Sequence, residues 1–265
     1  MFYLRFQKAI CTILFIAILF SLFLPFKDDD GEWTVMIAIL PTLIGLLIVF
    51  LILTQQHIKK VAGILENHCE YELFCKKAKK IADSKYAFRS VRESFRLAKI
   101  EALFDGGQFK QANDEFEQLD LSYIVIVQHI TYFIGYNNFL IKNHLRLNQL
   151  EEAQKAFATL EEYVERYKNR KRVSPVLISF LKLVEAEIDF YKKNYEKCTG
   201  LYQSIYESTD ATTKLKVHAA YKLGIILMGN DNQKAKEYFE YAIQRGNKFY
   251  VAHEAQEQLK SLSLA

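Results

Sequence analysis

The chain has 265 residues, of which 51% are hydrophobic and 25% are charged, and its formal net charge at pH 7 is +4. A net charge this small, without a stripe of basic residues interleaved with aromatic ones, argues against a nucleic-acid-binding protein. With 3 prolines and 10 glycines there are few chain breakers, and helix-forming residues dominate after residue 54, so the expected fold class is all-α.

Two uncharged apolar runs, residues 9–26 and 33–53, stand near the N-terminus. Each has close to the roughly 20 residues that a helix needs to cross a hydrocarbon core about 30 Å thick. A backbone in lipid must satisfy its own hydrogen bonds, so we expect helices at about 9–26 and 33–54, the second kinked at Pro41. Residues 1–54 are therefore predicted to form a transmembrane hairpin.

The charges around these runs predict how the hairpin is oriented. The segment between the runs is acidic, with Asp28, Asp29, Asp30 and Glu32. Basic residues flank the hairpin on its other side, and six lysines follow the second run: Lys59, Lys60, Lys76, Lys77, Lys79 and Lys80. The positive-inside rule then places both termini in the cytoplasm. The six lysines are predicted to face anionic lipid headgroups, at about 1 kcal/mol for each residue near the surface.

An alternative for the first run is a cleaved signal peptide, because a short basic start followed by an apolar stretch has that form. The run ends in SLFLPF and shows no small-x-small cleavage pattern, which favours a retained span. The predicted location is the plasma membrane or the inner membrane of a bacterium. The bacterial origin is favoured by the small size and simple plan of the chain.

Residues 55–85 are predicted to form a basic helical linker next to the membrane. Two arrangements are compatible with this stretch: a continuation of the second membrane helix, or a poorly formed first pair of repeat helices.

From residue 86 onward, one spacing recurs: large-x-x-small-x-x-x-aromatic-x-x-apolar. Three instances begin at Phe109, Leu150 and Tyr195, and a weaker fourth contains Ala235. The small residue allows close approach of a neighbouring helix. Each instance follows a turn and an earlier apolar-periodic helix, so the repeated unit is predicted to be helix, tight turn, helix.

This pattern resembles the tetratricopeptide repeat (TPR) family, whose second helix carries a small residue flanked by aromatic ones. Leu223 and Gly224 stand at the place of the family's Leu-Gly pair in the fourth unit. The family's leading Trp is absent, and the small positions lie about 41, 45 and 37 residues apart instead of a steady 34. The resemblance implies an α-solenoid of TPR-like helix pairs over residues 86–265, with a capping helix over 248–262.

The resemblance also implies a binding face, because TPR domains bind peptides or protein segments along a concave face formed by their first helices. Amides pair with a peptide backbone, basic groups with carboxylates, and aromatic rings with apolar side chains. The positions implied for this face are Asn138, Lys142, Arg146, Glu187, Phe190, Tyr191, His218, Tyr221 and Ile225.

No catalytic motif is visible: there is no Gly-rich phosphate loop, no nucleophile elbow and no His-Glu-x-x-His helix. His68, Cys69 and Cys75 come closest to a metal cluster, but the C-x5-C spacing matches no common zinc module. The four cysteines are also too sparse for a disulfide framework, which favours a reducing compartment. We therefore expect a protein that is not an enzyme and that holds no metal and no cofactor.

The leading hypothesis is a membrane-anchored scaffold or adaptor whose cytosolic solenoid binds a protein or peptide partner. The alternative is a regulatory subunit of a membrane enzyme, transporter or secretion complex. That subunit would contact its complex through small or polar hairpin residues such as Thr12, Ser21, Thr42 and Gly45. An enzyme would require a deep polar pocket with strongly perturbed titrating groups.

Overall fold

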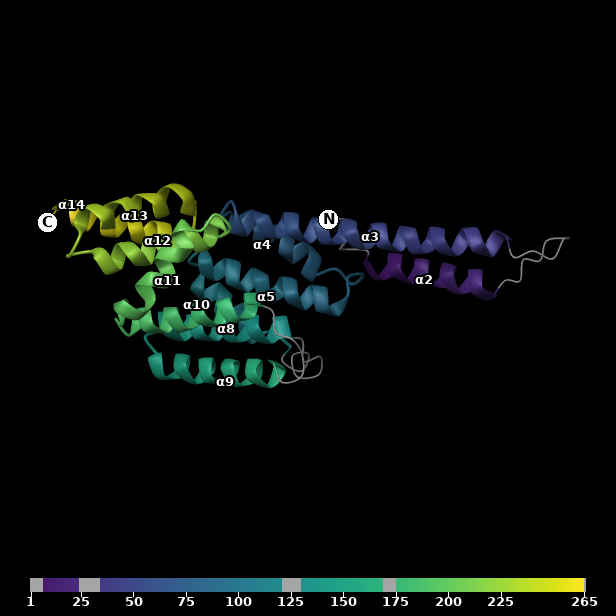
Figure 1. The fold of residues 1–265 in the computed structure, drawn as a ribbon, viewed down its shortest axis with the longest axis horizontal. Coiled ribbons are helices and arrows are strands. Elements are labelled where there is room, and N and C mark those ends of the chain that lie inside the picture. The colour runs from purple at the N-terminus through teal and green to yellow at the C-terminus, as the bar shows by residue number, and fades with distance from the viewer. Residues whose placement is uncertain (1–6, 24–33, 121–129, 169–174, 265) are drawn as a thin grey trace.

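The computed structural model describes residues 7–23, 34–120, 130–168 and 175–264, and the regular secondary structure in these ranges is all α-helical. The 12 helices of the described ranges are α2 (Gln7–Phe23), α3 (Thr34–Glu66), α4 (Tyr71–Ala82), α5 (Arg89–Asp105), α6 (Phe109–Glu117), α8 (Ile130–Arg146), α9 (Leu150–Lys168), α10 (Pro175–Tyr191), α11 (Tyr195–Glu207), α12 (Thr213–Leu227), α13 (Asn232–Gly246) and α14 (Tyr250–Leu264). Figure 1 shows α2 and most of α3 projecting from a body of packed helices. The predicted all-α class is confirmed.

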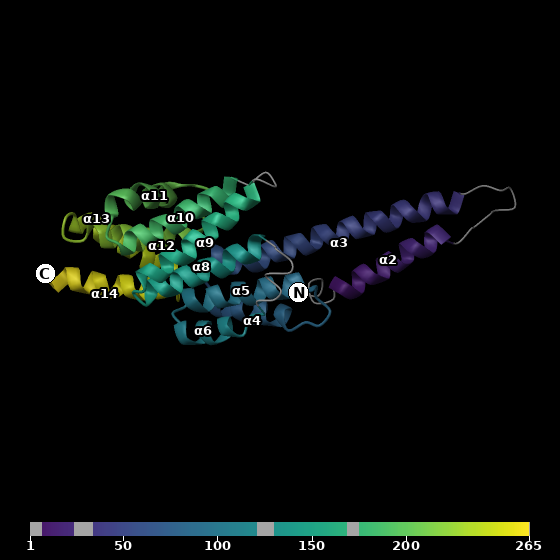
Figure 2. The same ribbon diagram turned by 90° about the horizontal axis from the view of Figure 1, so that it is seen from below.

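The projecting part contains one candidate membrane span. Within the described residues, only the Pro41–Glu66 segment of α3 is long and apolar enough to cross a membrane, and the apolar stretch of α2, Ala9–Leu19, is shorter. α2 packs beside α3 (Figure 2). The structure therefore shows a single candidate span where two were predicted. The acidic segment between the two runs lies outside the described residues.

α3 does not end where the apolar run ends. It continues to Glu66, and Val61, Ile64 and Leu65 near its end are buried in a hydrophobic cluster with Phe74 of α4. α4 then packs against α5. The 55–85 stretch thus contains both arrangements left open by the sequence, since the helix of the second apolar run continues and also packs with α4 inside the helical body.

The repeated units predicted from the spacing are present as sequential helix pairs, α5–α6, α8–α9, α10–α11 and α12–α13. The small residue of each unit, Ala112, Ala153, Cys198 or Ala235, is fully buried. This burial is the close helix approach that a small side chain permits. The structure is therefore consistent with a helical repeat.

Three of the turns within these pairs are built alike. Gly107, Asn148 and Lys193 adopt φ values of +76°, +57° and +63°. In each turn, this residue's N–H donates to the carbonyl three residues earlier, at 2.9–3.1 Å. The next N–H donates to the carbonyl five residues earlier, at 2.8–2.9 Å. This is the Schellman arrangement, which satisfies the free carbonyls of the ending helix and reverses the chain.

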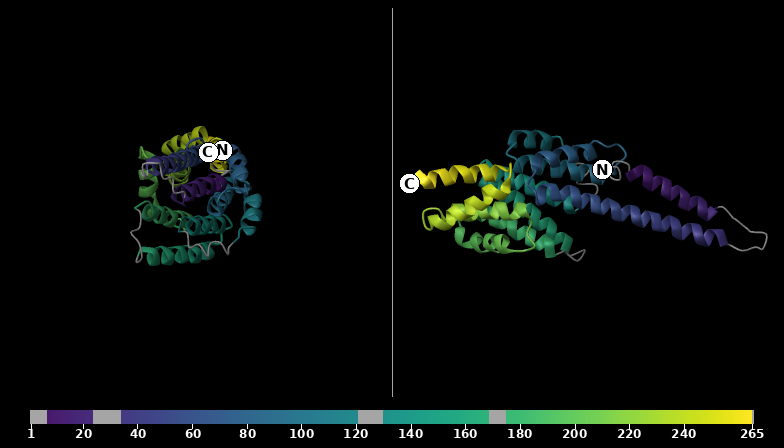
Figure 3. Two further views of the ribbon diagram at one scale, coloured as in Figure 1. Left: turned by 90° about the vertical axis from the view of Figure 1, so that its right-hand side faces the viewer. Right: turned by 90° about the horizontal axis from the view of Figure 1, so that it is seen from above.

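The two ends of the helical body contact each other. Apolar side chains from α3, α4 and α5 share one hydrophobic cluster with side chains from α12, α13 and α14, including Val61, Val217 and Phe249. Figure 3 shows the end of α3 beside the C-terminal helices. An ion pair joins Arg146 to Glu254 at 2.6 Å. We call this arrangement of α3–α6 and α8–α14 the closed stack. The predicted capping helix is α14, which packs against α12 and α13.

Gly224 in α12 lies where the next helix approaches most closely. A Cβ atom at this position would come within 2.5 Å of the ring of Phe239, which is itself fully buried in α13. We expect Gly224→Ala to lower the free energy of unfolding by about 1–3 kcal/mol, because the rigid ring has no space into which it can move. Thermal unfolding of the purified chain, followed by circular dichroism, measures the effect.

Gly200→Ala is the matched control, because Gly200 is also helical but a Cβ atom there would meet nothing within 4 Å. It should leave the melting temperature unchanged or raise it, since Ala is the better helix former. Equal melting temperatures for the Gly224→Ala variant and the unmodified chain would contradict the close α12–α13 packing.

Candidate functional site

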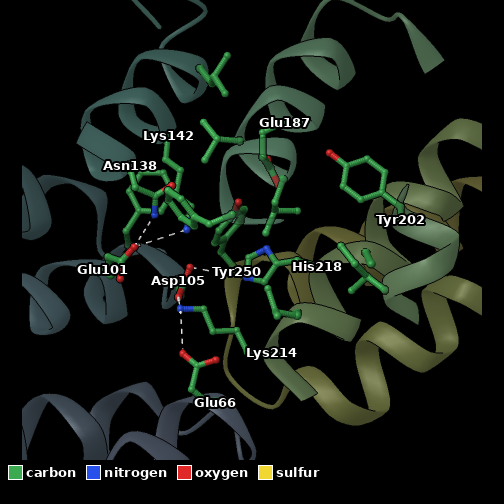
Figure 4. A pocket seen from close by; sticks show the side chains of 18 of the residues that line it. Glu66, Glu101, Asp105, Asn138, Lys142, Glu187, Tyr202, Lys214, His218 and Tyr250 are labelled. Carbon is green, nitrogen blue, oxygen red and sulfur yellow. Dashed lines mark hydrogen bonds and ion pairs between the residues drawn. The ribbon is translucent and has the colours of Figure 1, made fainter. Parts of the chain in front are cut away.

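A cavity of about 200 Å³ lies inside the closed stack. Its walls come from α5, α8, α10, α11 and α12, from the end of α3 and from the start of α14 (Figure 4). The charged lining residues are Glu66, Glu101, Asp105, Lys142, Glu187 and Lys214. The aromatic lining residues are Phe104, Phe180, Tyr191, Tyr202 and Tyr250, with His218 beside them. The cavity therefore combines several buried charges with an aromatic and aliphatic wall.

Asp105, the last residue of α5, forms the most deeply buried ion pair of the cavity. Its side chain is 1% exposed, and its Oδ2 lies 2.7 Å from Lys214 Nζ. Burial opposes ionisation of this carboxyl, but the Lys214 ammonium outweighs burial and holds the pKa of Asp105 below its usual value. Lys214 Nζ also lies 3.7 Å from Glu66 Oε1, so one ammonium serves two carboxylates.

A second ion pair joins Glu187 of α10 to Lys222 of α12. Lys222 also lies over the rings of Phe190 and Tyr202, at 5.3 and 5.1 Å from their centroids. Burial raises the pKa of the Glu187 carboxyl, but the neighbouring Lys222 ammonium outweighs it and lowers the pKa overall. Glu187 is thus held as a carboxylate at the cavity wall.

The third carboxylate, Glu101, has weaker cationic support. Its Oε1 accepts a 2.7 Å hydrogen bond from Asn138 Nδ2. The nearest ammonium is that of Lys142, at 3.8 Å. Asn138 and Lys142 lie one turn apart on α8, so both face this carboxylate.

His218 lies on α12 between the charged groups, with its Nε2 3.6 Å from Asp105 Oδ1. Burial, with smaller contributions from the nearby Lys142, Lys214 and Lys222, outweighs the opposing effect of Asp105 and lowers the pKa of His218 to about 4. The imidazole is therefore neutral at physiological pH. Its Nε2 is buried and has no hydrogen-bond partner among the described residues.

Tyr250, the first residue of α14, closes one side of the cavity. Its ring makes edge contacts with Phe104 and Phe109, at centroid distances of 6.0 and 5.3 Å. The Arg146 guanidinium lies 5.1 Å from the same ring. Burial raises the pKa of the Tyr250 hydroxyl well above its ordinary value, so the hydroxyl stays protonated.

Five of the nine positions implied by the TPR resemblance line this cavity: Asn138, Lys142, Glu187, Tyr191 and His218. The other four make internal contacts. Arg146 pairs with Glu254 and stacks over Phe109 at 4.3 Å. Phe190 packs in the cluster around Tyr202, and Tyr221 and Ile225 pack against the cluster that joins the two ends of the stack.

The sequence analysis missed Glu66, Glu101, Asp105, Lys214 and Tyr250. For three of them a signal was available, because Glu101 and Asp105 stand four residues apart, and Lys214 stands four residues before His218. Such spacing places the two side chains on one face of a helix. Glu66 and Tyr250 carry no comparable local signal, since they reach the cavity only through contact between the two ends of the chain.

The six lysines predicted to face lipid lie away from the cavity, on α3 and α4. Lys59, Lys60, Lys76, Lys79 and Lys80 are exposed, and Lys77 is half-buried. α4 reverses direction after the 67–70 turn and packs against α3. Its C-terminal lysines therefore lie beside the part of α3 that carries Lys59 and Lys60.

The described residues contain no group of three His, Cys, Asp or Glu side chains arranged to hold a metal ion. Cys69 and Cys75, singled out by their spacing, belong to or pack against the hydrophobic cluster at the end of α3. Burial raises the pKa of both thiols to about 12 and so disfavours the thiolate.

Comparison of the chain with protein-family models, with curated proteins and with solved structures gave no match. The resemblance to TPR repeats therefore rests on the repeat spacing alone, and the sequential helix pairs are consistent with a helical repeat.

The buried His218 predicts a specific dependence of stability on pH. The folded chain keeps this imidazole neutral down to a pKa of about 4, whereas the unfolded chain binds a proton near 6.5. Stability should therefore fall by up to ~3 kcal/mol as the pH drops from 6.5 to 4. His218→Gln removes this contribution, so its loss of stability over that range should be smaller. Thermal unfolding at a series of pH values gives both slopes.

His253→Gln is the control for this measurement, because His253 is exposed on α14. It should keep the pH dependence of the unmodified chain. An unchanged slope in the His218→Gln variant would show that His218 is not buried as a neutral group.

Proposed function

We propose that this protein is a membrane-anchored adaptor whose cytosolic helical domain binds a segment of a partner protein at the cavity. The observation that carries the proposal is the cavity itself, which presents charged, amide and aromatic groups from several helices at one place. Lys142 and Tyr191 are partly exposed, so the cavity reaches the surface beside them. Concave sites with a few convergent polar groups are the usual form of binding sites.

The sequential helix pairs support a TPR-like domain as the binding module. Repeat domains of stacked helices present side chains from successive first helices on one face. Here α5, α8, α10 and α12, the first helices of the four pairs, all contribute to the cavity wall. The proposed partner is therefore a protein or peptide, and neither nucleic acid nor a cofactor is part of the proposal.

For the anchor, we propose two spans with both termini in the cytoplasm, in the plasma membrane or a bacterial inner membrane. The long apolar part of α3 and the apolar helix α2 beside it support this arrangement. The lysines of α3 and α4 support it as well, because they follow the uncharged apolar run that ends at residue 53 and are mostly exposed. In that position they would contact anionic headgroups.

The cavity also bears on the enzyme alternative, since it contains titrating groups with shifted pKa values. General acid–base catalysis is most efficient when the pKa of the group lies near the working pH. The pKa values of Asp105, Glu187 and His218 are all shifted downward, away from neutrality. Ion pairs and burial account for these shifts, so a binding role is favoured over proton transfer.

One observation favours a regulatory subunit of a membrane complex. α3 is a continuous helix from its membrane segment to Glu66, whose carboxylate lies 3.7 Å from Lys214 in the cavity. A displacement of the span by partner helices would therefore move a charged group of the cavity wall. This second candidate places the main partner contact in the membrane.

Capture of the partner from cells tests both candidates. The full chain is compared with Tyr191→Ala, in which a partly exposed cavity residue is shortened. We expect the adaptor's partner to be captured by the full chain and lost by this variant, as measured by proximity labelling and detergent co-purification. A matched control, Tyr86→Ala, shortens an exposed tyrosine away from the cavity and should retain the partner.

A third arm replaces residues 1–54 by an unrelated two-span anchor. If the chimera still captures the partner and the cavity variant does not, the result supports the adaptor. A partner lost by the chimera but retained by the cavity variant would instead support the regulatory subunit. Retention by both would contradict both candidates.

A further inference from the structure

We infer that the cavity binds one basic side chain, lysine or arginine, of the partner segment. This inference rests on the proposed function and specifies the chemistry of its partner. It follows from the charge balance of the cavity, from the acceptor groups in its wall, and from its size.

The first argument is the charge balance. Four carboxylates belong to the cavity wall, from Glu66, Glu101, Asp105 and Glu187. The wall supplies two ammonium groups, and Lys222 adds a third through its pair with Glu187. His218 is neutral at physiological pH because its pKa is about 4. The nearby Arg146 and Glu254 neutralise each other. One negative charge is therefore left over, which a single cationic group would balance.

The contacts locate this surplus near Lys214. Its ammonium lies 2.7 Å from Asp105 but 3.7 Å from Glu66, so Glu66 has no cation of its own. Glu101 has Lys142 as its cation, but the two are 3.8 Å apart, so this pair is a loose one. Lysine and arginine heads carry several donors and no acceptor, and they form their strongest hydrogen bonds with carboxylates.

His218 adds no competing charge at this place. Its Nε2 is buried without a hydrogen-bond partner among the described residues, 3.6 Å from Asp105 Oδ1. An incoming carboxylate would be repelled, because it would add a second negative charge to the surplus.

The size and the wall of the cavity favour a side chain over a larger ligand. About 200 Å³ exceeds the roughly 150 Å³ of a cavity that admits benzene but is below the roughly 300 Å³ at which drug-sized pockets begin. Leu145, Leu183 and Tyr191 offer apolar surface. Lysine and arginine side chains have an apolar stem and a charged head, so they suit such a wall.

The experiment selects ligands from a library of random peptides displayed on phage. The full chain is held in nanodiscs of phosphatidylcholine, which carry no net charge, and empty nanodiscs remove peptides that bind lipid. A selected peptide is then synthesised with and without its basic residue, using norleucine as the uncharged replacement. Fluorescence anisotropy measures its Kd for the full chain, for Glu66→Gln and for Glu101→Gln. Glu257→Gln on exposed α14 is the control.

We expect selected peptides to share a lysine or arginine. Replacing that residue by norleucine should weaken binding by about tenfold or more, and so should each cavity substitution, while Glu257→Gln has no effect. Peptides that are acidic or uncharged and still lose affinity in Tyr191→Ala would overturn this inference and leave the adaptor standing. Failure to select any peptide would overturn both. If arginine amide binds as tightly as the peptide, the ligand is a free organic cation, and the assignment to a partner segment is wrong.

Discussion

The contact between the end of α3 and the C-terminal helices is the constraint on which the rest of the structure depends. Val61 of α3, Val217 of α12 and Phe249 before α14 belong to one hydrophobic cluster, so residues more than a hundred positions apart share a core. This contact brings Glu66 and Tyr250 into the wall of the same cavity. A row of helix pairs without it would expose the buried charges between α5 and α12 to water.

Inside the closed stack, the buried charges depend on one another. Removing a carboxylate or ammonium from water is costly, and the mutual attraction of a pair offsets this cost only when the geometry is close. Asp105 and Lys214 meet this condition at 2.7 Å, whereas Lys142 and Glu101 are 3.8 Å apart. We interpret the close ion pairs as structural, and the carboxylates of the more distant pairs as the groups that are available to bind a ligand. Because α3 is one continuous helix, it would link these structural ion pairs to the candidate membrane span.

Local patterns predicted much of this fold. Spacing alone identified the four helix pairs and their buried small residues, such as Ala112 and Cys198, because helix packing repeats with a short period. The nine positions predicted for a binding face do not all meet at the cavity, since Arg146 and Ile225 serve internal contacts. Those contacts depend on how the chain ends meet, which no short-range pattern encodes. Hydropathy predicted two spans, whereas the described residues show one candidate.

Closure of the stack can be measured on the unmodified protein by zero-length carbodiimide cross-linking and mass spectrometry. Glu72 of α4 and Lys248 before α14 are exposed, 176 residues apart in sequence, and their charged atoms lie 2.7 Å apart. At protein concentrations low enough to exclude cross-links between molecules, we expect an amide bond between these two side chains. The exposed pair Glu257–Lys260, at 2.9 Å within α14, is the positive control. A cross-link in the control pair without one between Glu72 and Lys248 would contradict the closed stack.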